Sequence, residues 1–131
     1  MQLEKRWWLG ILNTVEYFDG KSWKAAASMG TARWELGTAV YGGMLYAVGG
    51  NNGAAYLNTV EYFDGVSWKA AASMGTARYG LGTTVYAGML YAVGGHSGSA
   101  YLKTVEYFDG VSWKAAASIG TVRRELGAAV Y

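Results

Sequence analysis

Short, mostly apolar stretches rich in strand-forming residues, each bounded by glycine or polar turn residues, recur along most of the chain. The clearest set predicts β-strands, because strand-forming residues fill each stretch and none has the length of a typical helix. The four strands of this set are expected at 36–41, 44–48, 57–63 and 67–74. Between the first two, Gly42-Gly43 fits a two-residue hairpin turn, which needs positive φ at both positions. Asp64-Gly65 fits the next tight turn. The pattern therefore predicts a small antiparallel sheet.

The fourth stretch contains a Lys-Ala-Ala-Ala run, residues 69–72, that also has good helix propensity. Gly75 follows so closely that a helix would end after about one turn. We therefore expect a strand here as well.

The same pattern returns at a fixed interval. The motif TVEYFDG begins at Thr14, Thr59 and Thr104, which is a period of 45 residues, and residues 14–41 differ from residues 59–86 at only four positions. Most positions therefore serve the repeat rather than one unique site. Four strands in a unit of about 40–50 residues are typical of a β-propeller blade, a twisted sheet that packs against neighbours on both faces.

One repeat carries a recognisable set of residues. An apolar strand ends in Gly49-Gly50, and Tyr62, Trp68 and Arg78 follow it. This arrangement resembles the kelch repeat, and the resemblance covers nearly the whole chain after residue 12. It implies an all-β fold, a β-propeller of four-stranded antiparallel blades.

Three repeats are too few for a closed ring, since propellers have about four to eight blades. Tyr131 aligns with Tyr41, and Met1 aligns with Tyr46, so the chain carries two whole blades and complementary pieces of a third. We expect a homodimer in which two copies close head to tail into a six-bladed ring and share each junction blade. The expected units are an atypical segment 1–12 in a second-strand position, third and fourth strands of the shared blade at 13–29, complete blades at 30–74 and 75–119, and a first strand of the shared blade at 120–131.

Composition narrows the range of functions. The formal net charge is only +2 and the basic residues are dispersed, which argues against nucleic acid as a partner. Without cysteine, and with one histidine, the chain has no thiolate or multi-histidine metal site, and we expect no cofactor. No apolar run approaches the ~18 residues of a membrane span. The apolar run at 7–12 is too short for a secretion signal, so we expect a cytoplasmic protein.

The copies differ most in two loops of each blade, the loop before the first strand and the loop after the second. In an antiparallel blade these loops lie at the same end of the sheet, and loops on a rigid scaffold commonly carry binding. In kelch proteins this face often holds acidic peptides, so the resemblance implies a protein-binding face. The ligand-face candidates are Arg33, Trp34, Asn51, Asn52, Arg78, Tyr79, His96, Ser97, Arg123 and Arg124.

The repeated arginines Arg33, Arg78 and Arg123 have a second interpretation. They would cap carbonyl groups or form ion pairs inside the repeat, and the glutamates available for such pairs are Glu16, Glu61 and Glu106.

Nothing in the sequence indicates catalysis. His96 occurs once and has no acid beside it to orient the ring. We expect a non-enzymatic binding module whose partners are a second copy of the chain and an acidic peptide or protein. The uniformity of the copies also fits a designed, ancestral-like or fragmentary repeat assembly with no selected ligand, and both hypotheses stay open.

Overall fold

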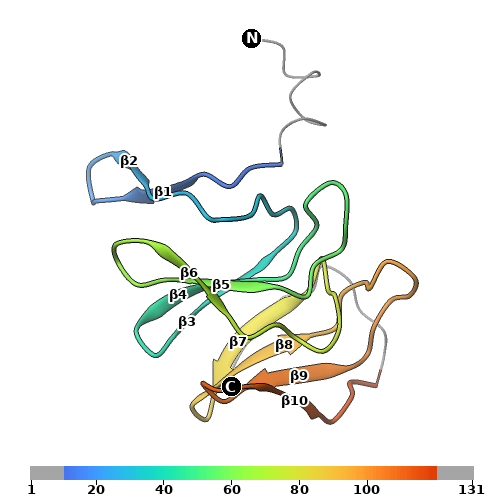
Figure 1. Cartoon of the computed structure of the whole chain (residues 1–131). Helices are drawn as coiled ribbons and strands as arrows, with labels where there is room; N and C mark the ends of the chain where they lie inside the picture. Colours follow the sequence, from blue (N-terminus) through green and yellow to red (C-terminus); the bar gives the residue numbers. More distant parts are fainter. Residues whose placement is uncertain (1–10, 121–131) are drawn as a thin grey trace.

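A computed structural model describes residues 11–120, in which ten strands form three antiparallel sheets (Figure 1). The first sheet, the N-terminal hairpin, consists of β1 (Val15–Phe18) and β2 (Trp23–Ala26). The second, the middle blade, has the order β3 (Gly37–Tyr41), β4 (Met44–Val48), β5 (Val60–Phe63) and β6 (Trp68–Ala71). The third, the last blade, has the same order with β7 (Gly82–Tyr86), β8 (Met89–Val93), β9 (Val105–Phe108) and β10 (Trp113–Ala116). No helix occurs within residues 11–120.

The four strands expected for the middle blade are present, but the fourth, expected at 67–74, extends only from Trp68 to Ala71 and so includes the first three residues of the Lys-Ala-Ala-Ala run. The third strand is shorter than predicted, because it begins at Val60 rather than at residue 57. The preceding residues make other hydrogen bonds: Leu57 N donates to Gly50 O, and Asn58 exchanges backbone and side-chain hydrogen bonds with Met74. These bonds tie the ends of the middle blade together outside its ladder.

The predicted turns follow their turn chemistry. Gly42 and Gly43 have φ of 58° and 78°, the two positive values of a tight hairpin turn. In the Asp-Gly turn, the Asp64 side chain accepts hydrogen bonds from the backbone N–H of Val66 and Ser67, at 2.8 and 2.9 Å. The equivalent aspartates of the other two sheets, Asp19 and Asp109, do the same.

The two blades stack face to face, and the main core lies between them. Tyr46 and Val48 of the middle blade pack there with Leu90 and Phe108 of the last blade. Because each sheet is apolar on both faces, it can pack a neighbour on either side. This property suits the strands to a row of stacked sheets.

The innermost strands of neighbouring blades, β3 and β7, approach closely. A Cβ placed on Gly37 would lie only 2.4 Å from Cγ2 of Thr83, so glycine is needed at that crossing. Thr83 also donates its hydroxyl to Thr38 O at 2.7 Å. The absence of a side chain on Gly37 thus lets the two blades approach at their inner edge, and the Thr83 hydrogen bond joins them there.

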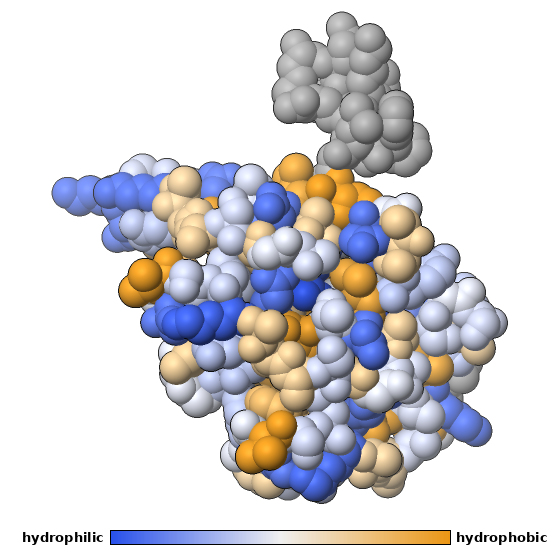
Figure 2. All heavy atoms as spheres, in the orientation of Figure 1, coloured by the Kyte–Doolittle hydropathy of each residue, from blue (hydrophilic) through white to orange (hydrophobic). Residues whose placement is uncertain are grey.

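The outer strands are joined by a tryptophan contact. Trp113 donates its indole N–H to Ala72 O of the middle blade at 2.9 Å, and Trp68 donates in the same way to Ala27 O, just after the N-terminal hairpin, at 2.8 Å. The equivalent Trp23 is 66% exposed. Apolar side chains also reach the surface where the described chain begins (Figure 2), Leu12 among them. The N-terminal end of the stack therefore exposes a tryptophan whose equivalents in the two blades are partly buried.

Candidate functional site

The two variable loops of the middle blade lie side by side. Trp34 and Asn51 exchange two backbone hydrogen bonds of 2.8 and 2.9 Å, which join the loop before β3 to the loop after β4. Tyr79 and His96 make the same pair of bonds in the last blade, at 3.0 and 2.9 Å. We call the surface formed by these loops, residues 33–35, 51–56, 78–80 and 96–101, the loop face.

A row of ring side chains occupies the loop face. Tyr56, from the middle blade, stacks on Tyr79, from the last blade, with ring centroids 4.9 Å apart. His96 lies 5.4 Å from Tyr79 and makes an edge contact with Tyr101 at 4.6 Å. Trp34, which is 54% exposed, precedes them on the middle blade. The row therefore crosses from one blade to the next and offers exposed aromatic surface.

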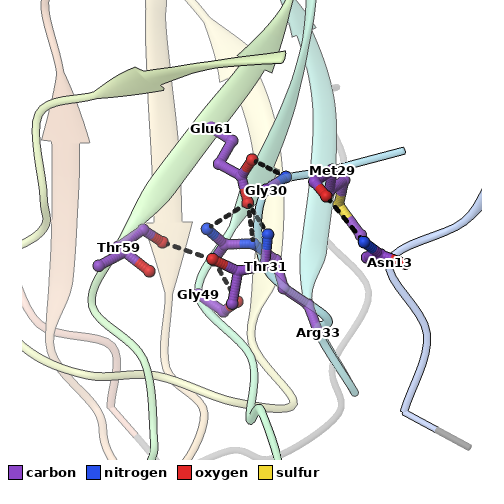
Figure 3. Close-up of polar contacts among 8 residues, drawn as sticks. All are labelled: Asn13, Met29, Gly30, Thr31, Arg33, Gly49, Thr59 and Glu61. Carbon is purple, nitrogen blue, oxygen red and sulfur yellow. Dashed lines mark hydrogen bonds and ion pairs between the residues drawn. The ribbon is translucent and has the colours of Figure 1, made fainter. Parts of the chain in front are cut away.

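Arg33 does not extend from the loop face into solvent. It is 4% exposed and lies inside the middle blade (Figure 3), where its Nη1 donates to Gly49 O and Thr59 O, each at 2.8 Å. Its Nε and Nη2 donate to one carboxylate oxygen of Glu61 at 3.2 and 3.0 Å.

Glu61 in turn receives the segment that arrives from the N-terminal hairpin. The backbone N–H groups of Gly30 and Thr31 donate to its two carboxylate oxygens at 2.6 and 3.1 Å (Figure 3). We call this arrangement of one glutamate, two backbone N–H groups and one arginine the clamp. It fastens the incoming chain to the third strand of the next blade.

The last blade contains a second clamp. Glu106 accepts from Gly75 N at 2.6 Å, from Thr76 N at 3.2 Å and from Nε of Arg78 at 3.1 Å. Arg78 is fully buried and also caps the carbonyl groups of Gly94 and Thr104.

Burial lowers the pKa of both clamp arginines, because desolvation disfavours the charged guanidinium, and the partner glutamate opposes this shift. Arg33 and Arg78 thus have the geometry of our second interpretation, since each caps carbonyl groups and pairs with a glutamate of its own repeat. Two other candidates, Arg123 and Arg124, lie outside the described residues.

The remaining candidates are polar loop residues, and they shape the loops. Asn51 accepts a hydrogen bond from Gly53 N at 2.7 Å, and His96 accepts the equivalent bond from Gly98 N through Nδ1 at 2.9 Å. Asn52 accepts from two backbone N–H groups, and Ser97 takes the same position in the last blade. The histidine therefore replaces an asparagine in a turn.

Sequence reasoning did not single out Tyr56 and Tyr101, which complete the aromatic row. They are 43% and 49% exposed. The signal was available, because a tyrosine stands at the same place in two loops whose other residues differ, Asn-Asn-Gly-Ala-Ala-Tyr and His-Ser-Gly-Ser-Ala-Tyr.

Two other features, a metal cluster and a membrane-spanning helix, do not occur in the described residues. Residues 11–120 include no group of three or more His, Asp, Glu or Cys side chains placed to hold a metal ion. They also contain no helix whose length and apolar character would suit it to cross a membrane.

Comparisons with known proteins agree with this fold. A family model described as the Kelch motif matches residues 35–75 and 77–114. Among solved structures, the chain is similar to one described as the structure of YjhT, with a TM-score of 0.71 and 19% sequence identity. That similarity covers 82% of this chain but only 45% of the YjhT chain, so this chain spans less than half of it. No curated protein sequence matches this chain.

Proposed function

The chain belongs to the kelch-motif family, and from this membership we propose that it is a non-enzymatic propeller scaffold that holds a partner protein or peptide on its loop face. The observation that carries the proposal is the aromatic row. Tyr56, Tyr79 and Tyr101 present rigid rings on two successive blades, and aromatic side chains are the residues that most often dominate protein interfaces. A scaffold that only holds a partner requires exposed binding groups such as these rings and no catalytic group.

The loop face offers binding groups rather than catalytic groups. Its buried arginines are engaged in the clamps, and His96 accepts a turn hydrogen bond through Nδ1. A general base needs a nitrogen that can reach a substrate proton and a neighbour that orients the ring. The contacts of these side chains support a structural role for each of them.

The acidic character expected of the partner rests on one position. The period of 45 residues aligns Arg124 with Trp34 and Tyr79, which belong to the loop face, whereas Arg123 aligns with the clamp arginines. In the proposal, Arg124 meets a carboxylate of the partner and the aromatic row meets its apolar side chains. An arginine pairs well with a carboxylate because two N–H groups can donate to it at once.

The ends of the stack support the second part of the proposal, which is assembly of two copies head to tail into a six-bladed ring. Tyr86, on the outer face of the last blade, is 55% exposed, whereas the equivalent Tyr41 is partly buried against Phe108. On the opposite end, Val40 of the middle blade is 65% exposed, whereas the equivalent Val85 is partly buried. Each blade thus exposes a residue whose equivalent in the other blade is partly buried, as expected of faces that a further blade would cover.

A hollow beside the N-terminal hairpin supports the same arrangement. It measures about 350 Å³, and its walls include Val15 and Leu45. The counterparts of these residues one period later, Val60 and Leu90, are buried in the core beside Tyr46. In the proposed ring a strand at 126–131 of the second copy contributes to the blade at this place.

Peptide selection tests the binding proposal. A displayed library holding acidic and neutral peptides in equal number is selected on the wild-type protein, and the enriched peptides are measured on two variants. Trp34→Ala with Arg124→Ala changes the loop face. Val66→Ala with Val111→Ala is the matched control, because these valines are 82% and 81% exposed in the turns at the opposite end of the blades.

We expect acidic peptides to be enriched, to lose affinity by about tenfold or more on the loop-face variant, and to bind the control as they bind the wild type. Enrichment of peptides that bind both variants equally would contradict the loop face as the site. A selection that enriches no peptide would favour the other hypothesis, a repeat assembly without a selected ligand, which the near-identity of the repeats supports.

A further inference from the structure

Two contacts join each of the two blades to the sheet before it, and they recur one period apart. The first is the indole hydrogen bond, from Trp68 to Ala27 O and from Trp113 to Ala72 O. The second is the clamp, in which Glu61 or Glu106 receives the chain segment that leaves the preceding sheet. In both contacts, the later sheet provides the tryptophan and the glutamate, and the earlier sheet provides the groups that meet them.

The N-terminal hairpin carries the same tryptophan and glutamate without these contacts. Trp23 is 66% exposed and Glu16 is exposed, whereas Glu61 and Glu106 are buried at 7% and 8% exposure. Within residues 11–120, no group meets Trp23 or Glu16 in the way that Ala27 and Ala72 meet the other two tryptophans and Gly30 and Gly75 meet the other two glutamates.

The other end of the chain carries the complementary groups. Ala117 follows β10 as Ala27 follows β2 and Ala72 follows β6, and it is exposed. Gly120 stands where Gly30 and Gly75 stand in the two clamps. The sequence then continues with Thr121 and Arg123 at the positions of the threonine and arginine of a clamp. These residues match what Trp23 and Glu16 lack, three periods further along the chain.

We propose that a second copy of this chain supplies these contacts. At each junction, Trp23 of one copy donates its indole N–H to the carbonyl oxygen of Ala117 in the other copy. Glu16 of the first copy accepts a hydrogen bond from the backbone N–H of Gly120 of the second, where the sequence continues with the threonine and arginine of a clamp. This inference rests on the head-to-tail assembly proposed above and names the side chains that hold it.

The proposed contacts also favour a second copy of the chain over other partners. Glu16 becomes buried in the assembled junction as its equivalents are in the clamps, so a surface without an arginine and two free N–H groups would leave its charge without partners at a high cost. Only the segment 120–123 repeats the sequence that the two internal clamps use. A second copy therefore fits this surface better than an unrelated apolar partner.

Solution mass and dissociation constant give the first test, measured on the full chain over a range of concentrations by light scattering and sedimentation. The variants are Trp23→Ala and Glu16→Gln, and the control is Val66→Ala, which removes an exposed apolar side chain from a turn. We expect a wild-type dimer, an unchanged control, and a dissociation constant raised by about a hundredfold in each junction variant, because about tenfold is lost at each of two junctions.

Cross-linking gives a second test that needs no dissociation constant. The chain contains no cysteine, so a Trp23→Cys chain is mixed with an Ala117→Cys chain and treated with a short bis-maleimide. We expect a covalent heterodimer on a denaturing gel, and none when Val66→Cys replaces Ala117→Cys.

The results separate this inference from the assembly on which it rests. A wild-type chain that is monomeric at all concentrations would overturn both. A wild-type dimer whose dissociation constant is unchanged by Trp23→Ala and Glu16→Gln would overturn the named contacts and leave the dimer standing. Failure of the Trp23→Cys chain to cross-link to the Ala117→Cys chain would do the same.

Discussion

Arg78 and Glu106 form an ion pair of 3.1 Å between Nη2 and Oε2 inside the last blade, although 28 residues separate them in the sequence. The guanidinium is fully buried, and the same carboxylate holds the two backbone N–H groups that follow the middle blade. The Glu106 carboxylate therefore links the segment that leaves the middle blade to the last blade. Its removal should disturb the link between blades.

The first prediction concerns this clamp. Glu106→Ala leaves Arg78 buried without its carboxylate, so the free energy of unfolding should fall by about 3–5 kcal/mol in urea denaturation at fixed protein concentration. Lys114→Ala, which removes the exposed partner of Asp109, is the control and should change stability little. Equal effects of the two substitutions would show that burial of the clamp does not matter.

The second prediction concerns the contact between neighbouring loops. A Cβ on Gly98 would lie 2.3 Å from Cδ2 of Tyr56, whereas a Cβ on Gly65 would meet nothing within 4 Å, and both glycines have φ of +100°. Gly98→Ala should therefore cost about 1–3 kcal/mol more than Gly65→Ala, because only the first displaces a packed ring. The near-ultraviolet circular dichroism of the tyrosines should also change in the first variant alone. If both variants lose the same free energy of unfolding, the loss comes from the positive φ alone and not from the contact with Tyr56.

The third prediction is a reciprocal exchange between two hairpins. The turn between β3 and β4 begins with Gly42 at φ of 58°, and the equivalent turn of the last blade begins with Ala87 at φ of 51°. A left-handed backbone is strained for alanine but not for glycine. Ala87→Gly should raise the melting temperature and Gly42→Ala should lower it, each by the equivalent of about 1 kcal/mol. A Cβ on residue 42 meets nothing within 4 Å, so shifts of the same sign would contradict this explanation.

The fourth prediction concerns acid. The lysine five residues on, and two backbone N–H groups, hold the pKa of the turn aspartates Asp19, Asp64 and Asp109 below the usual value of 3.8. A carboxyl group whose pKa is lower in the folded chain stabilises the fold above its unfolded pKa and loses this effect as the pH falls. Stability should therefore decline below about pH 4, and replacing all three aspartates by asparagine should flatten that decline. Urea midpoints measured across this range decide it, and an unchanged slope would assign the acid sensitivity to other carboxyl groups.

Much of the fold was readable because its signals are local. The hairpin at Gly42-Gly43 and the Asp64-Gly65 turn depend on residues that are adjacent in the chain, and a short apolar run between glycines predicts a strand such as β4. The period of 45 residues then predicts the same turns and strands in each repeat. The predicted strand ends were less accurate. Leu57 and Asn58 were expected in the third strand, but they form hydrogen bonds with Gly50 and Met74 instead.

The candidate site was readable only in outline. That the two variable loops share one end of the blade follows from antiparallel connection, and Trp34 beside Asn51 agrees with it. Whether an arginine points outward or inward cannot follow from its position in the sequence, because both orientations satisfy the same strand pattern. Tyr56 meets Tyr79 only because the two blades that carry them are neighbours in the stack.

By itself, the sequence determined the all-β repeat, its strands, its turns and its kelch character, since these arise from contacts among near neighbours and from a pattern copied every 45 residues. Only the tertiary structure decided that Arg33 and Arg78 are enclosed by Glu61 and Glu106. Burying a guanidinium is favourable only where several acceptors converge on it, and that convergence exists after the sheets have stacked and not before.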